Sequence, residues 1–164
     1  MSRPLSPETL VYGFTMAADP QVSPDGGRIV YSLASVDRET RQGRSDIWIC
    51  GIDGTNARRL TYGGRQNGSG RWSPEGSRVA FVSDRVEKSG LFVLPMEGGE
   101  ARELARHPNR ITDPAWSPDG SLIAYTAEVD PEAPEGREPP RDEPPPVRVT
   151  SRIDYKQDGR GYLG

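Results

Sequence analysis

Short apolar runs separated by turns recur along the chain and predict its main structural elements. The runs at residues 29–31, 79–81 and 123–125 are apolar at consecutive positions rather than at alternate ones. That pattern is typical of strands in a β-sheet that is covered on both faces. Each run follows a Ser-Pro-Asp-Gly or Ser-Pro-Glu-Gly sequence. Proline holds φ at about −65° at the second turn position, and glycine takes the positive φ that closes the turn. The pattern therefore predicts three β-hairpins.

The hairpins belong to a longer repeat, because several landmarks recur at one spacing. Ser73 and Ser117 are 44 residues apart, and Trp48 and Phe92 keep the same separation. The first turn precedes the second by 50 residues, and the six extra residues fall in the polar stretch 36–44. Two further strands are expected in each of the first two units, at residues 46–50, 57–61, 91–94 and 101–105. Four short strands and a period of about 44 residues predict a β-propeller blade.

The predicted fold class is all-β, an incomplete β-propeller of about three four-stranded blades preceded by a short N-terminal helix. We expect an N-terminal helical extension at residues 1–15 and blades across residues 16–127, with units at about 22–61, 72–105 and 111–127. Ser6 as N-cap and Pro7 at the first helical position favour a helix over residues 7–12. Closed propellers have about four to eight blades. Since the outermost sheets would lack neighbours, we expect the isolated chain to be poorly stable.

The remaining residues break the repeat. Residues 128–146 hold seven prolines and seven acidic side chains, a composition that cannot bury enough apolar surface to offset the loss of chain entropy. We expect an exposed, protease-sensitive loop there. Residues 147–155 alternate like a strand, so residues 147–164 are expected to begin a further strand or hairpin, with the sequence ending in mid-blade.

The repeats resemble those of TolB-type proteins and of the prolyl oligopeptidase family. Residues 5–10 (Leu-Ser-Pro-Glu-Thr-Leu), residues 19–26 (Asp-Pro-Gln-Val-Ser-Pro-Asp-Gly) and residues 152–162 after the acidic insertion resemble the acylaminoacyl-peptidase branch of these S9 serine peptidases. The resemblance implies a propeller that caps a C-terminal α/β-hydrolase domain with a Ser-Asp-His triad and restricts access to short peptides. It also implies that residues 5–14 pack on that hydrolase domain.

No catalytic, metal-binding or cofactor-binding residue is assigned from the sequence, and the substrate-binding residues stay unknown. A nucleophile elbow needs Gly-x-Ser-x-Gly, and the stretch Asn67-Gly-Ser-Gly70 lacks that flanking pattern. The single histidine, His107, is expected in a loop, and one histidine with one cysteine cannot supply a zinc site. Cys50 follows an apolar run and is expected to be a small buried hydrophobe.

Two further features are interpreted without a function. The glycine-rich stretch 63–70 lacks the Gly-Lys-Ser/Thr ending of a phosphate-binding loop, so we interpret it as a flexible connection between blades. A set of arginines could face a peptide carboxylate in the propeller channel, but solvated loop and edge-strand charges are the simpler interpretation: Arg38, Arg41, Arg44, Arg58, Arg59 and Arg65.

Charge and hydropathy exclude several classes of partner. The net charge of −3 and the pI of about 5.3 do not favour nucleic-acid binding, which needs a clustered basic face. No stretch approaches the roughly 20 apolar residues of a membrane span, and the first ten residues lack the apolar run of a signal peptide. These observations and the single cysteine predict a cytoplasmic protein with no cofactor, no nucleic-acid partner and no membrane partner.

Three functions are compatible with these observations. The leading hypothesis is a non-catalytic propeller segment that gates a serine peptidase and selects substrates by size. Its partners are then the rest of the same polypeptide, with further blades and the hydrolase domain, and a peptide substrate. The alternatives are a TolB-like propeller that binds a ligand or protein without enzymatic activity, and a cytoplasmic scaffold. Whether the protein forms a homo-oligomer is left open, as are its peptide specificity and total number of blades.

Overall fold

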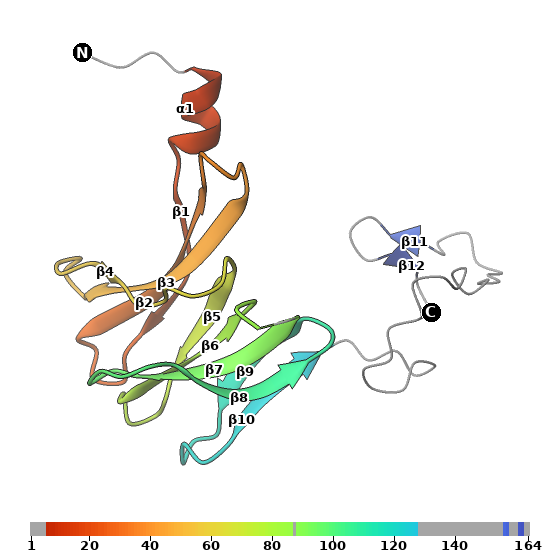
Figure 1. The fold of residues 1–164 in the computed structure, drawn as a ribbon. Coiled ribbons are helices and arrows are strands. Elements are labelled where there is room, and N and C mark those ends of the chain that lie inside the picture. The colour runs from red at the N-terminus through yellow and green to blue at the C-terminus, as the bar shows by residue number, and fades with distance from the viewer. Residues whose placement is uncertain (1–5, 87, 128–155, 158–160, 163–164) are drawn as a thin grey trace.

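The computed structural model describes residues 6–86, 88–127, 156–157 and 161–162. Two antiparallel four-stranded sheets and a third hairpin follow one another along the chain (Figure 1). The first sheet has the order β1-β2-β3-β4 and the second the order β5-β6-β7-β8. This arrangement confirms the predicted all-β fold of an incomplete propeller. The elements of the first two sheets are β1 (Met16–Val22), β2 (Arg28–Val36), β3 (Gly43–Gly51), β4 (Arg58–Arg59), β5 (Asn67–Trp72), β6 (Arg78–Ser83), β7 (Ser89–Pro95) and β8 (Arg102–His107).

The third unit contains one described hairpin, β9 (Ile111–Trp116) paired with β10 (Ile123–Ala127). A separate short pair joins β11 (Lys156–Gln157) to β12 (Gly161–Tyr162). The expected loop at residues 128–146 and the expected strand at 147–155 lie outside the described residues. The fourth strand of the first sheet is shorter than expected, because only Arg58 and Arg59 pair with β3.

The Ser-Pro-Asp/Glu-Gly turns close the three hairpins as predicted. Gly26, Gly76 and Gly120 have φ values of 73°, 73° and 69°, where a side chain would be strained. The serine of each turn binds the far side of the hairpin. In the third turn the Ser117 hydroxyl donates to the Asp119 carboxylate and accepts the Leu122 N–H at 2.9 Å. The turns therefore fix the register of each hairpin from local sequence alone.

Adjacent sheets are joined by a tryptophan at the end of the first strand. The Trp72 indole N–H donates to the Gln21 carbonyl in β1 at 3.1 Å, and the Trp116 indole N–H donates to the Arg71 carbonyl in β5 at 3.0 Å. Each bond connects one unit to the unit before it. Because a half-buried indole N–H without a partner is costly, the bond also fixes how far one sheet can slide along the next.

An arginine just after the first and second turns completes the same junction from the other side. The Arg28 guanidinium lies 4.9 Å from the Trp72 ring centroid and donates to the Gly76 carbonyl at 3.4 Å. Arg78 lies 4.8 Å from the Trp116 ring centroid and donates to the Gly120 carbonyl at 3.4 Å. We call each tryptophan–arginine pair an inter-blade clasp.

The clasp has no counterpart at the two ends of the described propeller. The position of the tryptophan is taken by Val22 in the first unit, where the residue is 55% exposed. The position of the arginine is taken by Leu122 in the third unit, where the residue is 70% exposed. At both ends, therefore, an aliphatic side chain occupies a position that holds a tryptophan or an arginine in the internal junctions.

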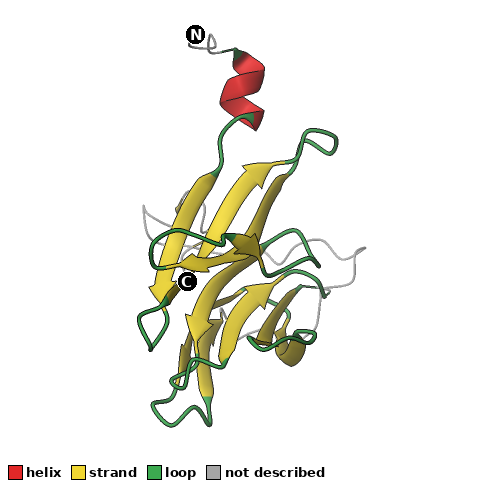
Figure 2. Ribbon diagram, turned by 90° about the vertical axis from the view of Figure 1, so that its left-hand side faces the viewer, coloured by secondary structure: helices red, strands yellow, loops and turns green. Residues whose placement is uncertain are grey.

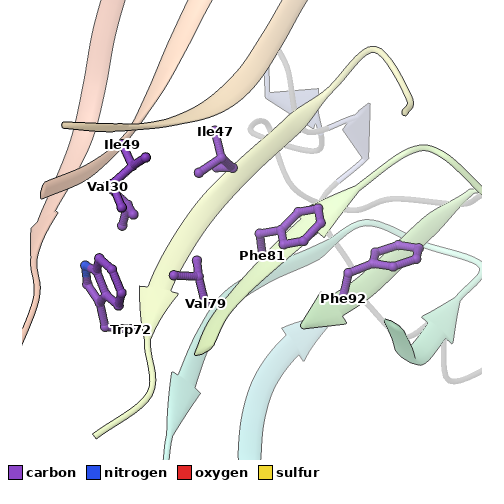
Figure 3. Close-up of a cluster of buried hydrophobic side chains, with 7 residues drawn as sticks. All are labelled: Val30, Ile47, Ile49, Trp72, Val79, Phe81 and Phe92. Atoms are coloured by element: carbon purple, nitrogen blue, oxygen red, sulfur yellow. The ribbon is translucent and has the colours of Figure 1, made fainter. Parts of the chain in front are cut away.

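The apolar core lies between the sheets rather than inside any one of them. Val30, Ile47 and Ile49 of the first sheet pack with Trp72, Val79, Phe81 and Phe92 of the second (Figure 3). On its other face the second sheet packs against Ile111 of β9. The second sheet is thus covered on both sides, as its continuous apolar runs predicted. Cys50 is half-buried rather than buried, because Ile47 and Ile49 occupy the inward-facing positions of β3.

The predicted N-terminal helix is present as α1 (Pro7–Tyr12), with the Ser6 hydroxyl accepting the Thr9 N–H at 3.2 Å. The helix stands beyond the ends of the strands (Figure 2), and none of its residues is buried. Its contact with the first sheet includes the Arg38 guanidinium, which lies 5.5 Å from the Tyr12 ring centroid. The long β2–β3 turn thus meets the helix at this end of the sheet.

Replacing Trp116 by phenylalanine tests the clasp. Trp116→Phe removes the indole donor and part of the ring, so we expect the free energy of unfolding to fall by about 1–3 kcal/mol. Urea denaturation followed by circular dichroism measures the change. Trp48→Phe is the matched control, since Trp48 is also half-buried and its indole has no hydrogen bond within the described residues. Equal losses in the two variants would contradict the clasp.

The turn carboxylates make a second prediction, about acid stability. Hydrogen bonds from the Ser117 hydroxyl and from the Ser121 amide and hydroxyl lower the pKa of Asp119 to about 2. An unfolded Asp has a pKa of about 3.9, so this carboxylate stabilises the fold above that pH and loses its effect as the pH falls through about 2. We expect Ser121→Ala to raise the Asp119 pKa and Ser121→Thr to leave it low. A carboxyl NMR titration in which both variants match the parent chain would refute the assignment.

Candidate functional site

The first strand of each unit lies along one edge of the stacked sheets. β1 contacts β5, and β5 contacts β9, while β4 and β8 stand at the opposite edges of their sheets. In a propeller, the edge where the blades meet surrounds the central axis. β1, β5 and β9 are therefore the inner strands, and their free edges face that axis.

Each inner strand carries a bulge at the same place in the repeat. Asp19, Ser69 and Asp113 have φ values of 51°, 55° and 50°, and the strand pairing shifts register at each of them. Non-glycine residues adopt positive φ infrequently, and bulges redirect side chains out of the sheet. The sequence analysis missed this feature, although Asp19 and Asp113 occupy equivalent positions of the repeat. The Asp19 carboxylate accepts a hydrogen bond from Arg71 Nη1 of the next unit at 2.7 Å.

A buried carboxylate lies behind the inner strands, in the junction between the first two sheets. Asp46 is 4% exposed. Its Oδ1 accepts the Thr61 hydroxyl at 3.1 Å and the Asn67 amide Nδ2 at 3.1 Å, and its Oδ2 accepts Arg44 Nε at 2.7 Å. Arg59 Nε lies 3.5 Å from the same Oδ2. The charge is therefore paired and hydrogen-bonded, as burial of a carboxylate requires.

Asn67 connects this carboxylate to the second sheet. Besides Asp46, its Nδ2 donates to the Ser45 carbonyl at 3.3 Å and to the Gly63 carbonyl at 3.0 Å. Its Oδ1 accepts the Ser83 hydroxyl at 2.7 Å and Arg85 Nη2 at 3.3 Å. We call Asp46, Asn67 and their partners the polar hub. The interpretation of residues 63–70 as a flexible connection was wrong for residues 67–70, which form the start of β5, with Asn67 only 1% exposed.

Arg85 brings a cation to the same hub. Its guanidinium lies 4.9 Å from the Phe81 ring centroid and 4.7 Å from the Phe92 ring centroid. Burial lowers the pKa of Arg85 from its usual value, and the guanidinium remains charged at neutral pH. Through Arg85, the polar hub therefore contacts the buried aromatic rings of the second sheet.

A pocket of about 580 Å³ opens beside the hub. Its walls come from the start of β5, the end of β6, the start of β7 and the connection that leads into β9. The floor includes the buried side chains of Asn67, Ser83, Ser89 and Ile111. Lys88 and Arg110 add cationic side chains to the lining, and Asp84 adds a carboxylate.

The residues singled out from the sequence have separate positions. His107 ends β8, and its Nδ1 accepts the Asn109 N–H at 3.1 Å, which places it at a strand end rather than in the loop proper. Arg44 and Arg59 form ion pairs with the buried Asp46. The interpretation of these two arginines as solvated charges was therefore wrong. Three other arginines of that set, Arg41, Arg58 and Arg65, are exposed.

The described side chains suit binding and positioning. No group of three or more potential metal-binding side chains occurs in the described part of the chain. No described helix has the length and apolar character needed to cross a membrane. What the arrangement offers is a pocket with mixed polar and apolar lining, with a hydrogen-bonded wall on one side.

Comparisons with known proteins agree with this architecture. Residues 7–133 match the family model described as the TolB beta propeller domain. A 67-residue stretch is 39% identical to "Uncharacterized peptidase YuxL" of Bacillus subtilis, covering 41% of this chain and 10% of that protein. The chain thus spans about a tenth of this curated relative.

Solved structures extend the comparison at the level of the fold. Pyrococcus horikoshii acylaminoacyl peptidase superposes with a TM-score of 0.70 at 16% identity, covering 94% of this chain and 22% of that one. TolB from Acinetobacter baumannii superposes with a TM-score of 0.57 at 21% identity, covering 70% of this chain and 27% of that one. These likenesses confirm the resemblance to both groups as far as the propeller fold is concerned.

Placing a second carboxylate in the polar hub tests its arrangement. Asn67→Asp keeps the shape of the side chain and replaces a donor by an oxygen about 3.1 Å from Asp46 Oδ1. We expect a loss of about 3–5 kcal/mol of stability at neutral pH. Like-charge repulsion raises the carboxyl pKa of the pair, so part of the loss should be recovered as the pH falls and one carboxyl takes up a proton.

Urea denaturation at several pH values measures the effect, with Gln42→Glu as the control. Gln42 is exposed in the β2–β3 turn, so the same change of charge should have a small effect there. A pH-independent deficit in Asn67→Asp, or an equal deficit in Gln42→Glu, would contradict the proposed hub.

Proposed function

This chain belongs to the TolB β-propeller family, and we propose that it is a propeller segment that gates a serine peptidase similar to acylaminoacyl peptidases. In this proposal the hydrolysis of peptides or N-acylated peptides is carried out by an α/β-hydrolase domain elsewhere in the same polypeptide. The propeller restricts which molecules reach that domain, so short peptides are favoured over folded proteins.

The extent of the structural likeness is the observation that carries the proposal. The peptidase superposes on 94% of this chain, whereas the TolB structure superposes on 70%. The TM-score is also higher for the peptidase, 0.70 against 0.57. The local 39% identity to a protein named as a peptidase supports the same choice.

The N-terminal helix supports the proposal by its exposed apolar surface. In the helix Leu10 is 57% exposed and Val11 49%, and Phe14, two residues after the helix, is 57% exposed. The helix buries no residue against the blades. Covering such side chains gains roughly 25 cal/mol per Å² of apolar surface. We propose that the hydrolase domain covers this helix in the complete polypeptide, as the resemblance at residues 5–14 implies.

The test is to isolate the protein from its native source and determine its intact mass and its activity together. We expect a polypeptide much larger than 18 kDa, or an 18 kDa chain tightly bound to a second one, that hydrolyses a chromogenic N-acylated amino acid or peptide. A serine-directed inhibitor should abolish the hydrolysis. A lone 18 kDa species without this activity would overturn the proposal.

The second candidate is a TolB-like propeller that binds a ligand or a protein without enzymatic activity. The pocket beside the polar hub favours it, since the described residues form that pocket without any further domain. The same isolation separates the two functions, because a binding propeller would show no inhibitor-sensitive hydrolysis at any polypeptide length.

A further inference from the structure

The pocket beside the polar hub lies at a junction that is complete in this chain. Most of its walls belong to the second sheet and to the connection and first residues of β9, and Ser45 of β3 adds a side from the first sheet. The clasp of Trp116 and Arg78 closes the junction of the second and third units. Its volume of about 580 Å³ lies within the roughly 300–1,000 Å³ of small-ligand sites. The described residues of packed units therefore form the pocket.

The charged groups in the lining favour an anion. Among the described residues of the lining, Asp84 is the one that carries a carboxylate, and its Oδ1 already accepts the N–H groups of Arg65 at 2.7 Å and Gln66 at 2.9 Å. Lys88 and Arg110 carry positive charge. Arg110 is exposed and forms no ion pair or hydrogen bond within the described residues. Its planar guanidinium fits the two oxygens of a carboxylate.

The other walls suit the backbone and side chain of a peptide. β5 is the edge strand of its sheet, and the bulge removes Ser69 from the pairing with β6. The free edge of a strand can hydrogen-bond an extended segment. Val82 and Pro108, both half-buried, add apolar surface to the same pocket.

We propose that this pocket binds the C-terminal end of a short peptide. The terminal carboxylate binds Arg110, the last side chain packs against Val82 and Pro108, and the peptide backbone follows the free edge of β5 at Gly68 and Ser69. The polar hub holds β5 in place, so the edge is already formed before the peptide binds. This inference needs only the described chain, and it stands or falls separately from the proposed peptidase.

The test titrates the 164-residue chain with N-acetyl-Ala-Ala-Leu, monitored by the amide NMR signals of Gly68, Ser69 and Ile111. We expect saturable shifts at these amides. The C-terminal amide of the same peptide, which lacks the charge, should bind about tenfold more weakly. Acetate separates a peptide site from a simple anion site, and it should bind far more weakly than the peptide.

Arg110→Gln should weaken binding of the free-acid peptide about tenfold and leave binding of the amide nearly unchanged. Arg58→Gln is the matched control, because Arg58 is exposed on β4, outside the pocket lining, and it should bind both peptides like the parent chain. Unshifted amides at the pocket, equal binding of acid and amide, or acetate binding as tight as the peptide would each overturn the proposal.

Discussion

The inter-blade clasp is the interaction on which the rest of the structure depends. An indole N–H of one unit reaches a carbonyl of the preceding unit, and an arginine of that preceding unit stacks on the same ring. Each sheet has an apolar face that is stable only when another sheet covers it. The clasp fixes the orientation of one sheet on the next and the distance between them. With that distance fixed, the inner strands lie side by side, and the polar hub and the pocket can form between the sheets.

The clasp also explains how the chain presents its two ends. Val22 and Leu122 occupy the positions of the missing tryptophan and arginine and are largely exposed. An aliphatic side chain at these positions can pack against another sheet through apolar contact, but it cannot form the hydrogen bond that the tryptophan makes in the internal junctions. In the proposed function, further blades of the same polypeptide would cover these two side chains. The chain covers 22% of the peptidase on which it superposes.

Features set by local chemistry could be predicted from the sequence, and features set by distant contacts could not. The three turns, their hairpins and the N-terminal helix depend on residues within a few positions of one another, and they form where expected. The burial of Asn67 comes from hydrogen bonds to Asp46, Ser83 and Gly63, which lie in different elements. The glycine-rich sequence around Asn67 gave no sign of these contacts, so its burial could not be predicted. The bulges at Asp19, Ser69 and Asp113 show only as a weak repeat of residue type, because aspartate recurs at the first and third positions and serine stands at the second.

Amide hydrogen exchange of the isolated chain tests most directly that the described sheets are consecutive blades of an incomplete propeller. Protection follows the cover that each strand receives. The account predicts the slowest exchange in β6 and β7 of the second sheet, which described residues cover on both faces, and much faster exchange in β1, where Met16 and Val22 are exposed. Equally slow exchange in β1, β6 and β7 would contradict the account.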